Sequence, residues 1–216
     1  MKKPGLLLVV ILSLFVVVPA GAQHRIGLVG GINLAQFSLD PEPRAGIALP
    51  NRTAFGIGGV LDLGLTKNVA LRLEPMYLQK GSKVEDFGRE IGKEKWSYIE
   101  APVLFKLALG AKATRPYLVA GPTIGYLLSA KYSSATGEND IKKYFRNFDF
   151  GLAFGTGVSF PVGNNSIFLE GRYASGLSNI LNVPSAPDVK LKTKGLQMVA
   201  GITFPLGAGN SVAASR

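Results

Sequence analysis

The chain of 216 residues has no cysteine and only one histidine. The absence of cysteine excludes a disulfide framework, a thiol nucleophile, a cysteine-based metal site and a lipid anchor on an N-terminal cysteine. The one histidine, His24, follows an expected cleavage site by two residues, which is a poor position for a general base. We therefore expect no Ser–His hydrolase, no metal site and no cofactor, and we predict that the protein is not an enzyme.

The chain is also poor in charge, with 18% charged residues against 47% hydrophobic ones. This balance excludes a disordered chain. After the first 22 residues, no apolar run reaches the length of a transmembrane helix, and no heptad pattern appears. The length suits one domain of ordinary size or one all-β barrel.

The N-terminal segment has the pattern of a secretory signal peptide. Two lysines precede an apolar run from Leu6 to Val18, and the small residues 20–22 close it. The run is short for a membrane anchor, so we predict cleavage after Ala22. Cleavage removes two of the basic residues and lowers the net charge from +10 to +8.

Alternation of apolar with small or polar residues recurs along the chain, and a period of two is the period of a β-strand. In the stretch 69–81, an apolar face that contains Leu71 alternates with a face that contains Arg72 and Glu74. The stretch FDFGLAFGTGVSF alternates bulky residues with Gly, Ala and Ser. The stretch PYLVAGPTIGYLLSA is apolar on both sides, so its faces stay unassigned. Together these segments predict about eight strands.

The connections between the expected strands alternate in length. Short connections are expected at 65–68, 108–115 and 161–165, and long ones at 38–51, 81–95, 131–146 and 178–193. Short turns at one end and long loops at the other are typical of outer-membrane β-barrels. An even number of strands places both termini at the end with the short turns.

The alternation alone also fits a soluble sandwich of two packed sheets, which is the alternative fold. Two features favour lipid outside a barrel. The apolar faces are long enough for spanning strands of about 9–11 residues. The opposite faces carry small residues with isolated charges of both signs, which suits a narrow lumen filled by its own side chains. The predicted fold class is therefore all-β, a closed antiparallel up-and-down transmembrane β-barrel of about eight strands.

Charges that face such a lumen must pair, because an isolated buried charge costs several kcal/mol. The predicted lumen charge network comprises Asp62, Arg72, Glu74, Glu100, Lys106, Asp149, Glu170 and Arg172. Aromatic residues near the predicted strand ends are candidates for the girdles of a membrane barrel, although core or loop aromatics would give the same pattern. They are Tyr77, Trp96, Tyr98, Tyr117, Tyr126, Tyr132 and Tyr173.

Several segments follow one another in a characteristic order. After an opening GLVGGINLAQF come LRLEPMYLQKG, YIEAPVLFKL, PYLVAGP, DFGLAFGTG and LEGRYASGLSNI. From about Ile26 to Phe204, their order and spacing resemble the successive strands of the PorT-like outer-membrane β-barrel domain family. The resemblance implies a barrel in the bacterial outer membrane, reached by Sec-type export with signal-peptide cleavage. Some relatives are associated with export of secreted proteins, and the family offers no catalytic residues to carry over.

The domains expected are a signal peptide at 1–22, the barrel at 23–204 and a flexible periplasmic tail at 205–216. Phe204 takes the place of the aromatic residue that ends many outer-membrane barrels. Prolines at 75, 102 and 122 lie inside predicted strands. Each removes one ladder donor, so we expect bulges or a flared rim there.

Basic residues in two of the expected long loops are candidates for contact with lipopolysaccharide phosphates, and solvated loop charge is the alternative. They are Lys131, Lys142, Lys143, Arg146, Lys190, Lys192 and Lys194. The expected partners are outer-membrane lipid, lipopolysaccharide and an unidentified protein. Nucleic acid is not expected for a secreted barrel.

Three functions fit this sequence. The first is a structural or partner-binding role through the long surface loops, linked to protein export. The second is a narrow transport pore or export component, although a lumen filled by side chains argues against free diffusion. The third is a surface enzyme acting on lipid or glycan, in which Glu74, Glu100 and Glu170 would converge as acid–base carboxylates. A structural ion-pair network explains the same carboxylates and is the reading we prefer.

Overall fold

A computed structural model describes residues 23–110, 113–184 and 188–206. The expected signal peptide lies outside the described residues, and so does the expected tail beyond Leu206. The elements are β1 (His24–Asp40), β2 (Ile47–Ala48), β3 (Arg52–Gly64), β4 (Val69–Leu73), β5 (Met76–Lys80), β6 (Lys83–Asp86), β7 (Arg89–Ala108), β8 (Arg115–Ser134), β9 (Gly137–Asp140), the 3-10 helix η1 (Lys142–Tyr144), β10 (Phe148–Val162), β11 (Asn165–Gly176) and β12 (Lys190–Leu206). Among the residues described, no helix has the length and apolar character needed to cross a membrane.

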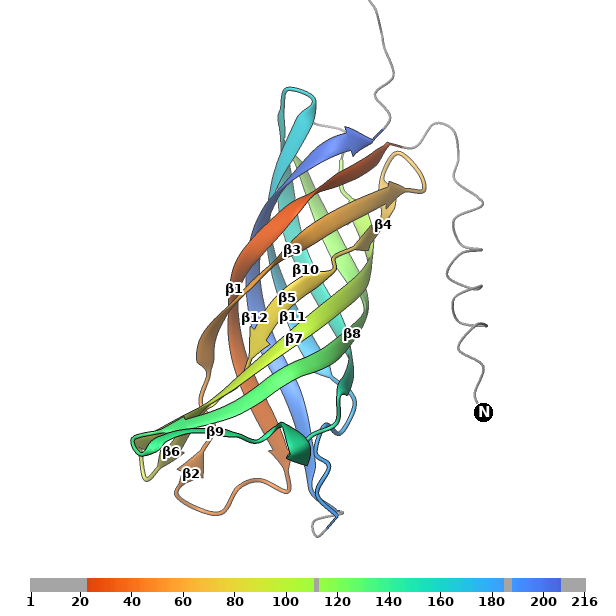
Figure 1. The fold of residues 1–216 in the computed structure, drawn as a ribbon. Coiled ribbons are helices and arrows are strands. Elements are labelled where there is room, and N and C mark those ends of the chain that lie inside the picture. Colours follow the sequence, from red (N-terminus) through yellow and green to blue (C-terminus); the bar gives the residue numbers. More distant parts are fainter. Residues whose placement is uncertain (1–22, 111–112, 185–187, 207–216) are drawn as a thin grey trace, which may run out of the picture.

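The strands form a closed antiparallel ring with eight positions (Figure 1). In ring order these are β1, β3, β4 with β5, β7, β8, β10, β11 and β12. The last strand pairs with the first along its whole length, from His24 opposite Leu206 to Asp40 opposite Lys190. The predicted fold class is confirmed, since consecutive wall strands are neighbours and the ring leaves no open edge in the wall.

The side chains sort into two environments along every wall strand. In β10, Phe150, Leu152 and Phe154 point outward and are about half exposed, whereas Asp149 and Ala153 are buried inside the ring. The same alternation makes a continuous band of outward apolar side chains around the barrel. A soluble protein rarely exposes so large an apolar surface, so this band belongs in the hydrocarbon of a membrane.

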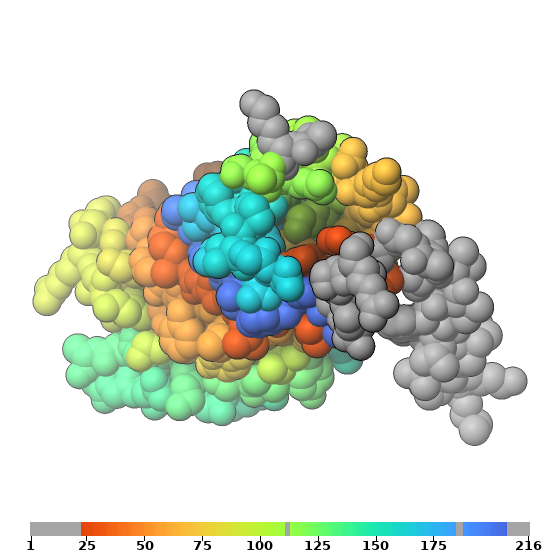
Figure 2. All heavy atoms as spheres, turned by 90° about the horizontal axis from the view of Figure 1, so that it is seen from above, coloured from red at the N-terminus to blue at the C-terminus, as the bar shows by residue number. Residues whose placement is uncertain are grey.

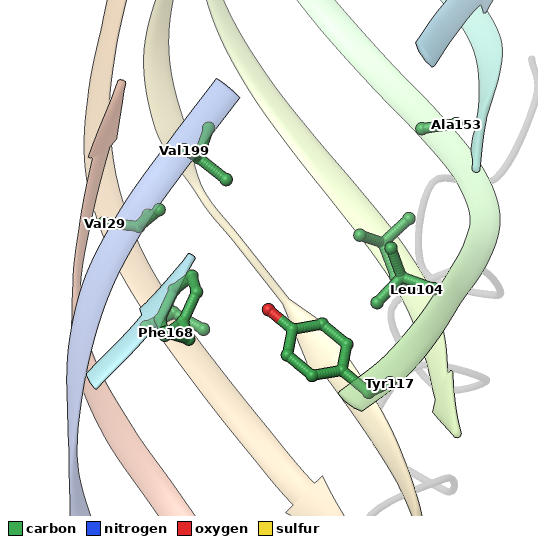
Figure 3. Packing of buried hydrophobic residues seen from close by; sticks show 8 residues of the cluster. Val29, Leu104, Tyr117, Ala153, Phe168 and Val199 are labelled. Atoms are coloured by element: carbon green, nitrogen blue, oxygen red, sulfur yellow. The ribbon is translucent and has the colours of Figure 1, made fainter. Parts of the chain in front are cut away.

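The structure also settles the faces of β8, which the sequence left open. Tyr117, Val119 and Leu127 are buried inside, while Leu118 and Ile124 are exposed outside. Figure 3 shows Val29, Val199 and Phe168 lying across the interior from Leu104 and Tyr117. An apolar cluster therefore lines part of a lumen that also holds charges. It consists of Val29, Val60, Leu104, Tyr117, Val119, Ala153, Phe168 and Val199.

Two of the expected long loops are largely strand. Residues 83–95 form β6 and the start of β7, and residues 131–140 contain the end of β8 and β9. Together with β2 these strands extend one side of the wall beyond the apolar band, at the bottom of Figure 1. The loop prediction was wrong here because most side chains on both faces of this extension are exposed or only partly buried. Neither face then needs apolar residues, and the sequence alternation disappears.

The prolines behave differently from the expected bulges. Pro75 separates β4 from β5, while Pro102 and Pro122 lie inside continuous strands. The Pro102 carbonyl still accepts a backbone hydrogen bond of 3.1 Å from the β4–β5 junction. The register shift between β7 and β8 lies at Ser97 and Tyr98 instead. A proline removes a donor but keeps its carbonyl, so the register can continue past it.

Three of the aromatic residues proposed for a girdle lie inside the barrel. Trp96, Tyr98 and Tyr117 are each 0% exposed. Their apolar neighbours in the lumen hold them there, so the girdle interpretation was wrong for these residues. Tyr126 does point outward, is 41% exposed and contacts Phe148 on the outer wall, with 5.3 Å between the ring centroids.

Candidate functional site

Most of the lumen charge lies in one cluster near the end with the short turns. We call it the turn-end network, and it consists of Asp62, Arg72, Glu74, Lys106, Glu170 and Arg172. These residues come from β3, β4 and its end, β7 and β11, and five of the six are buried. Three cations face three carboxylates, so the cluster is neutral as a whole.

Arg72 is the centre of this network. Its guanidinium donates two hydrogen bonds to Asp62, of 2.6 Å from Nε and 2.9 Å from Nη2. Its Nη1 donates to Glu170 at 3.1 Å and to Glu74 at 3.4 Å. The planar guanidinium suits such forked pairing, and its face lies over the Phe168 ring with 4.5 Å to the centroid.

The remaining members complete the pairing. Arg172 forms ion pairs with Glu74 and, at 3.1 Å, with Glu170. Lys106 donates to Asp62 at 2.9 Å, and the Tyr117 hydroxyl donates to Glu170 at 3.0 Å. Every carboxylate in this cluster therefore meets at least one cation, which is what a buried charge requires.

A second cluster lies further toward the long-loop end, and we call it the loop-end network. Lys80 pairs there with Glu100 and, at 3.1 Å, with Asp149. Asp149 also accepts hydrogen bonds from the hydroxyls of Thr193 at 2.7 Å and Ser178 at 3.1 Å. Two buried carboxylates are therefore stabilised by ion pairs with one lysine and by hydrogen bonds from two hydroxyl groups.

The structure splits the eight predicted lumen residues between these two networks. Glu74 and Glu170 share their arginines, whereas Glu100 belongs to the other cluster, so the three glutamates do not converge as the enzyme hypothesis required. Lys80 is the member that the predicted set omitted. Its signal was available, because Lys80 is in phase with Arg72 and Glu74 on the inward face of the same alternation.

A cluster of apolar side chains, which we call the apolar cap, packs inside the barrel beyond the loop-end network. Trp96 packs against Phe37 and Phe145, with ring centroids 4.5 and 4.2 Å apart. The apolar cap consists of Phe37, Trp96, Tyr98, Leu127, Ala130, Ile180 and Leu191, with Phe145 packed against it. Going from the short turns to the long loops, the lumen therefore contains the turn-end network, the loop-end network and the apolar cap.

Of the seven basic residues expected in loops, four lie in strands, two lie in the 3-10 helix and one lies in a connecting segment. Lys131 is bonded to Glu138 at 2.7 Å, while Lys142 and Lys143 belong to η1. Arg146 is exposed. The loop assignment was wrong for Lys131, which is part of β8, and for Lys190, Lys192 and Lys194, which are part of β12. The last two point outward just beyond Leu196, at the edge of the apolar band.

The carboxylates of both lumen networks are held in ion pairs. Within the described ranges, no group of three or more His, Asp or Glu side chains is arranged to hold a metal ion. Each lumen carboxylate is engaged by a cation, and the single histidine lies at the start of β1, away from both networks.

A comparison with known protein families identifies the family of this chain. A model described as the outer membrane protein beta-barrel domain matches residues 21–182, which is well over half of the chain. The chain belongs to this family. It is a bacterial outer-membrane β-barrel protein, and the apolar band is its lipid-facing surface.

Several solved structures are similar to this outer-membrane protein over most of its length. Ail of Yersinia pestis is 18% identical, with 84% of this chain and 99% of that chain covered and a TM-score of 0.43. Neisserial surface protein A is 16% identical, covering 84% and 97%, with a TM-score of 0.48. OprG of Pseudomonas aeruginosa is 15% identical, covering 87% and 97%, also with a TM-score of 0.48. No curated protein matches the chain.

Proposed function

We propose that this protein is a closed, partner-binding barrel of the PorT-like type, which acts through its long-loop end and does not conduct solutes. The observation that carries the proposal is the filling of the lumen. Two ion-pair networks and the apolar cap occupy successive levels of the interior. A barrel with eight wall positions is narrow enough for side chains to fill it.

The long-loop end offers the surface for a partner. There β2, β6, β9 and the ends of β7 and β8 extend the wall as a small sheet beyond the apolar band. Phe87, at the tip of the β6–β7 hairpin, is 85% exposed. Exposed aromatic residues are favoured at protein interfaces. The PorT-like resemblance makes protein export the process to which such a partner would belong.

Lipid phosphate is the second partner in this proposal. Lys192 and Lys194 lie at the long-loop edge of the apolar band, and no ion pair involves either of them within the described ranges. This is the level at which lipopolysaccharide phosphates would meet the wall, and ammonium groups bind phosphate by charge-assisted hydrogen bonds. Sec-type export with cleavage after Ala22 would leave Gln23 as the first residue, directly before β1.

Planar-bilayer recordings test the closed lumen. We expect the purified mature protein to add no stable conductance. The variant Arg72→Ala removes the central side chain of the turn-end network. Its conductance, measured in the same way on folded protein, is compared with that of the unaltered protein. Steady unitary conductance from the unaltered protein would contradict the proposal and would favour the narrow pore.

Site-specific photocrosslinking tests the partner. A photoreactive amino acid in place of Phe87 should give a discrete adduct in living cells. The matched control replaces Phe160, an outward aromatic residue near the opposite end of the wall. The same adducts from both positions, or none from Phe87, would contradict a partner at the long-loop end.

A further inference from the structure

The lumen opens at the short-turn end into a cavity that neither ion-pair network occupies. The cavity has a volume of about 850 Å³ and is bordered by the starts of β1 and β4 and by the turns after β3 and β10. Figure 2 looks onto this end of the molecule and shows a recess between the cyan residues of the β10–β11 turn and the orange residues of the β3–β4 turn. We call this cavity the turn-end vestibule. Its volume lies within the range of known small-molecule sites.

The charged residues that line the vestibule are mostly cations. Four cations line it, namely Arg25, Lys67, Lys106 and Arg115, and Asp62 is the one acidic residue among its described lining. Asp62 is already bonded to Arg72 and Lys106 within the neutral turn-end network. The charges of Arg25 and Lys67 therefore remain as an excess over the turn-end network, which is neutral as a whole.

Arg25 is held in place by neutral groups. Its Nε donates to the Thr203 hydroxyl at 3.0 Å. Its Nη2 donates to the backbone carbonyls of Asn164 and Thr203, each at 3.0 Å. These bonds join β1 to β12 and to the β10–β11 turn, and no carboxylate takes part in them. Asp62 lies opposite Arg25 in the β1–β3 register and attracts its charge without forming an ion pair with it. A guanidinium fixed in this way is a preorganised contact for a further anion.

We propose that the turn-end vestibule binds a small soluble polyanion that carries phosphate or carboxylate groups. Arg25 and Lys67 provide the contacts at the rim, and Lys106 lies at the floor. The vestibule opens along the barrel axis, whereas lipid headgroups surround the wall from outside. A soluble ligand therefore fits this geometry better than a membrane lipid. Concave walls also concentrate the field of the cations and favour anion entry.

Titration calorimetry on the folded mature protein in zwitterionic nanodiscs tests this site. Tripolyphosphate is the phosphate probe and citrate is the carboxylate probe. We expect saturable binding at low salt that weakens as salt rises. Arg25→Gln and Lys67→Gln should each weaken binding about tenfold, because each removes one charge-assisted contact. Lys67 is an exposed turn residue, so its variant keeps the test valid if Arg25→Gln fails to fold.

The matched control is Arg89→Gln, which removes the same charge from an exposed residue at the opposite end of the barrel. Unchanged affinity in this variant would support a local site. An equal loss in all three variants would show attraction to net charge only and would overturn the proposal, as would the absence of saturable binding. Repeating the titration in nanodiscs with phosphatidylglycerol separates the two sources of phosphate. Loss of tripolyphosphate binding there would show that lipid headgroups compete for the vestibule and would overturn the soluble ligand.

Discussion

Arg72 stabilises the barrel by neutralising carboxylates that have no access to water. Its side chain is 0% exposed and contacts Asp62, Glu74 and Glu170. A buried pair gains little over apolar packing, but removal of one member leaves charges unpaired at a high cost. The lumen residues are therefore interdependent, and their energies should not add.

The first prediction concerns this interdependence. Arg72→Met should lower the free energy of unfolding by about 3–5 kcal/mol, because Asp62 and Glu170 lose their main partner. The double variant Arg72→Met with Glu74→Gln should recover part of the loss, because one uncompensated charge disappears. Urea unfolding in lipid vesicles measures both.

Arg89→Met is the matched control for these variants. Arg89 is exposed at the β6–β7 hairpin, so its replacement should change the free energy of unfolding by less than about 0.5 kcal/mol. An Arg72→Met variant as stable as this control would show that the turn-end network does not stabilise the fold.

Glu94 shows the opposite situation, because no cation in the described part of the chain forms an ion pair with it. It lies on the part of β7 beyond the apolar band, and its Oε2 is buried without a hydrogen-bond partner within the described residues. Burial raises the pKa of Glu94 from 4.5 to about 7. Between pH 4.5 and about pH 7, the folded state therefore keeps a proton on Glu94 that the unfolded state has already released.

The second prediction follows from this pKa. Because the folded pKa is higher than the unfolded one, the stability linked to Glu94 is fully present below about pH 4.5 and is lost as the pH rises toward 7. Glu94→Gln should remove this pH dependence and make the protein more stable than the unaltered chain at pH 8. Urea midpoints at pH 5 and pH 8 measure the difference. The exposed Glu42→Gln serves as control, and an identical response of both variants would refute the assignment.

At the scale of the elements, the seam between β1 and β12 closes the barrel. The two strands pair along all 17 residues of β1. Inward glycines on β1 let the backbones approach closely, since a Cβ on Gly31 would lie 2.1 Å from the Met198 carbonyl oxygen. Neighbouring Gly30 points outward, and its nearest atom to a Cβ would be 3.5 Å away.

The third prediction compares these two neighbours. Gly31→Ala should destabilise the barrel by about 3 kcal/mol, because backbone must shift to admit the methyl group. Gly30→Ala should leave the stability of the barrel almost unchanged. The fraction of heat-modifiable folded protein on unboiled gels measures both, and equal fractions would show that the seam tolerates a side chain.

At the scale of the whole molecule, the outward band decides where the protein lies. Leu28, Ile57, Phe105 and Phe154 are between 58% and 66% exposed, from four different strands. In water such a surface would drive association, whereas in a bilayer it meets hydrocarbon. The membrane is thus the solvent that this fold requires on its outside.

The fourth prediction uses the depth of this band. Phe154 lies halfway along the outward face of β10, and Phe160 lies near its turn end. Phe154→Arg should lower the free energy of unfolding in vesicles by about 2–4 kcal/mol, and Phe160→Arg by about 1 kcal/mol or less. A migration shift between boiled and unboiled samples of the outer-membrane fraction should accompany folding. Equal costs at both depths would contradict a membrane centred on Phe154.

The sequence by itself determined the strands of the closed wall, their number of about eight and the inward or outward direction of most of their residues. A period of two assigns faces wherever one face meets lipid and the other meets a polar lumen. It failed on β8, where both faces are apolar, and on the β6–β7 hairpin, where most side chains are exposed or only partly buried. Only the tertiary structure decided which lumen charges meet. Partners such as Arg72 and Glu170 are 98 residues apart in the chain, and the curvature and register of the closed ring bring them together. The same closure places Trp96 inside the lumen and joins the rim cations of Arg25 and Lys67 around one cavity.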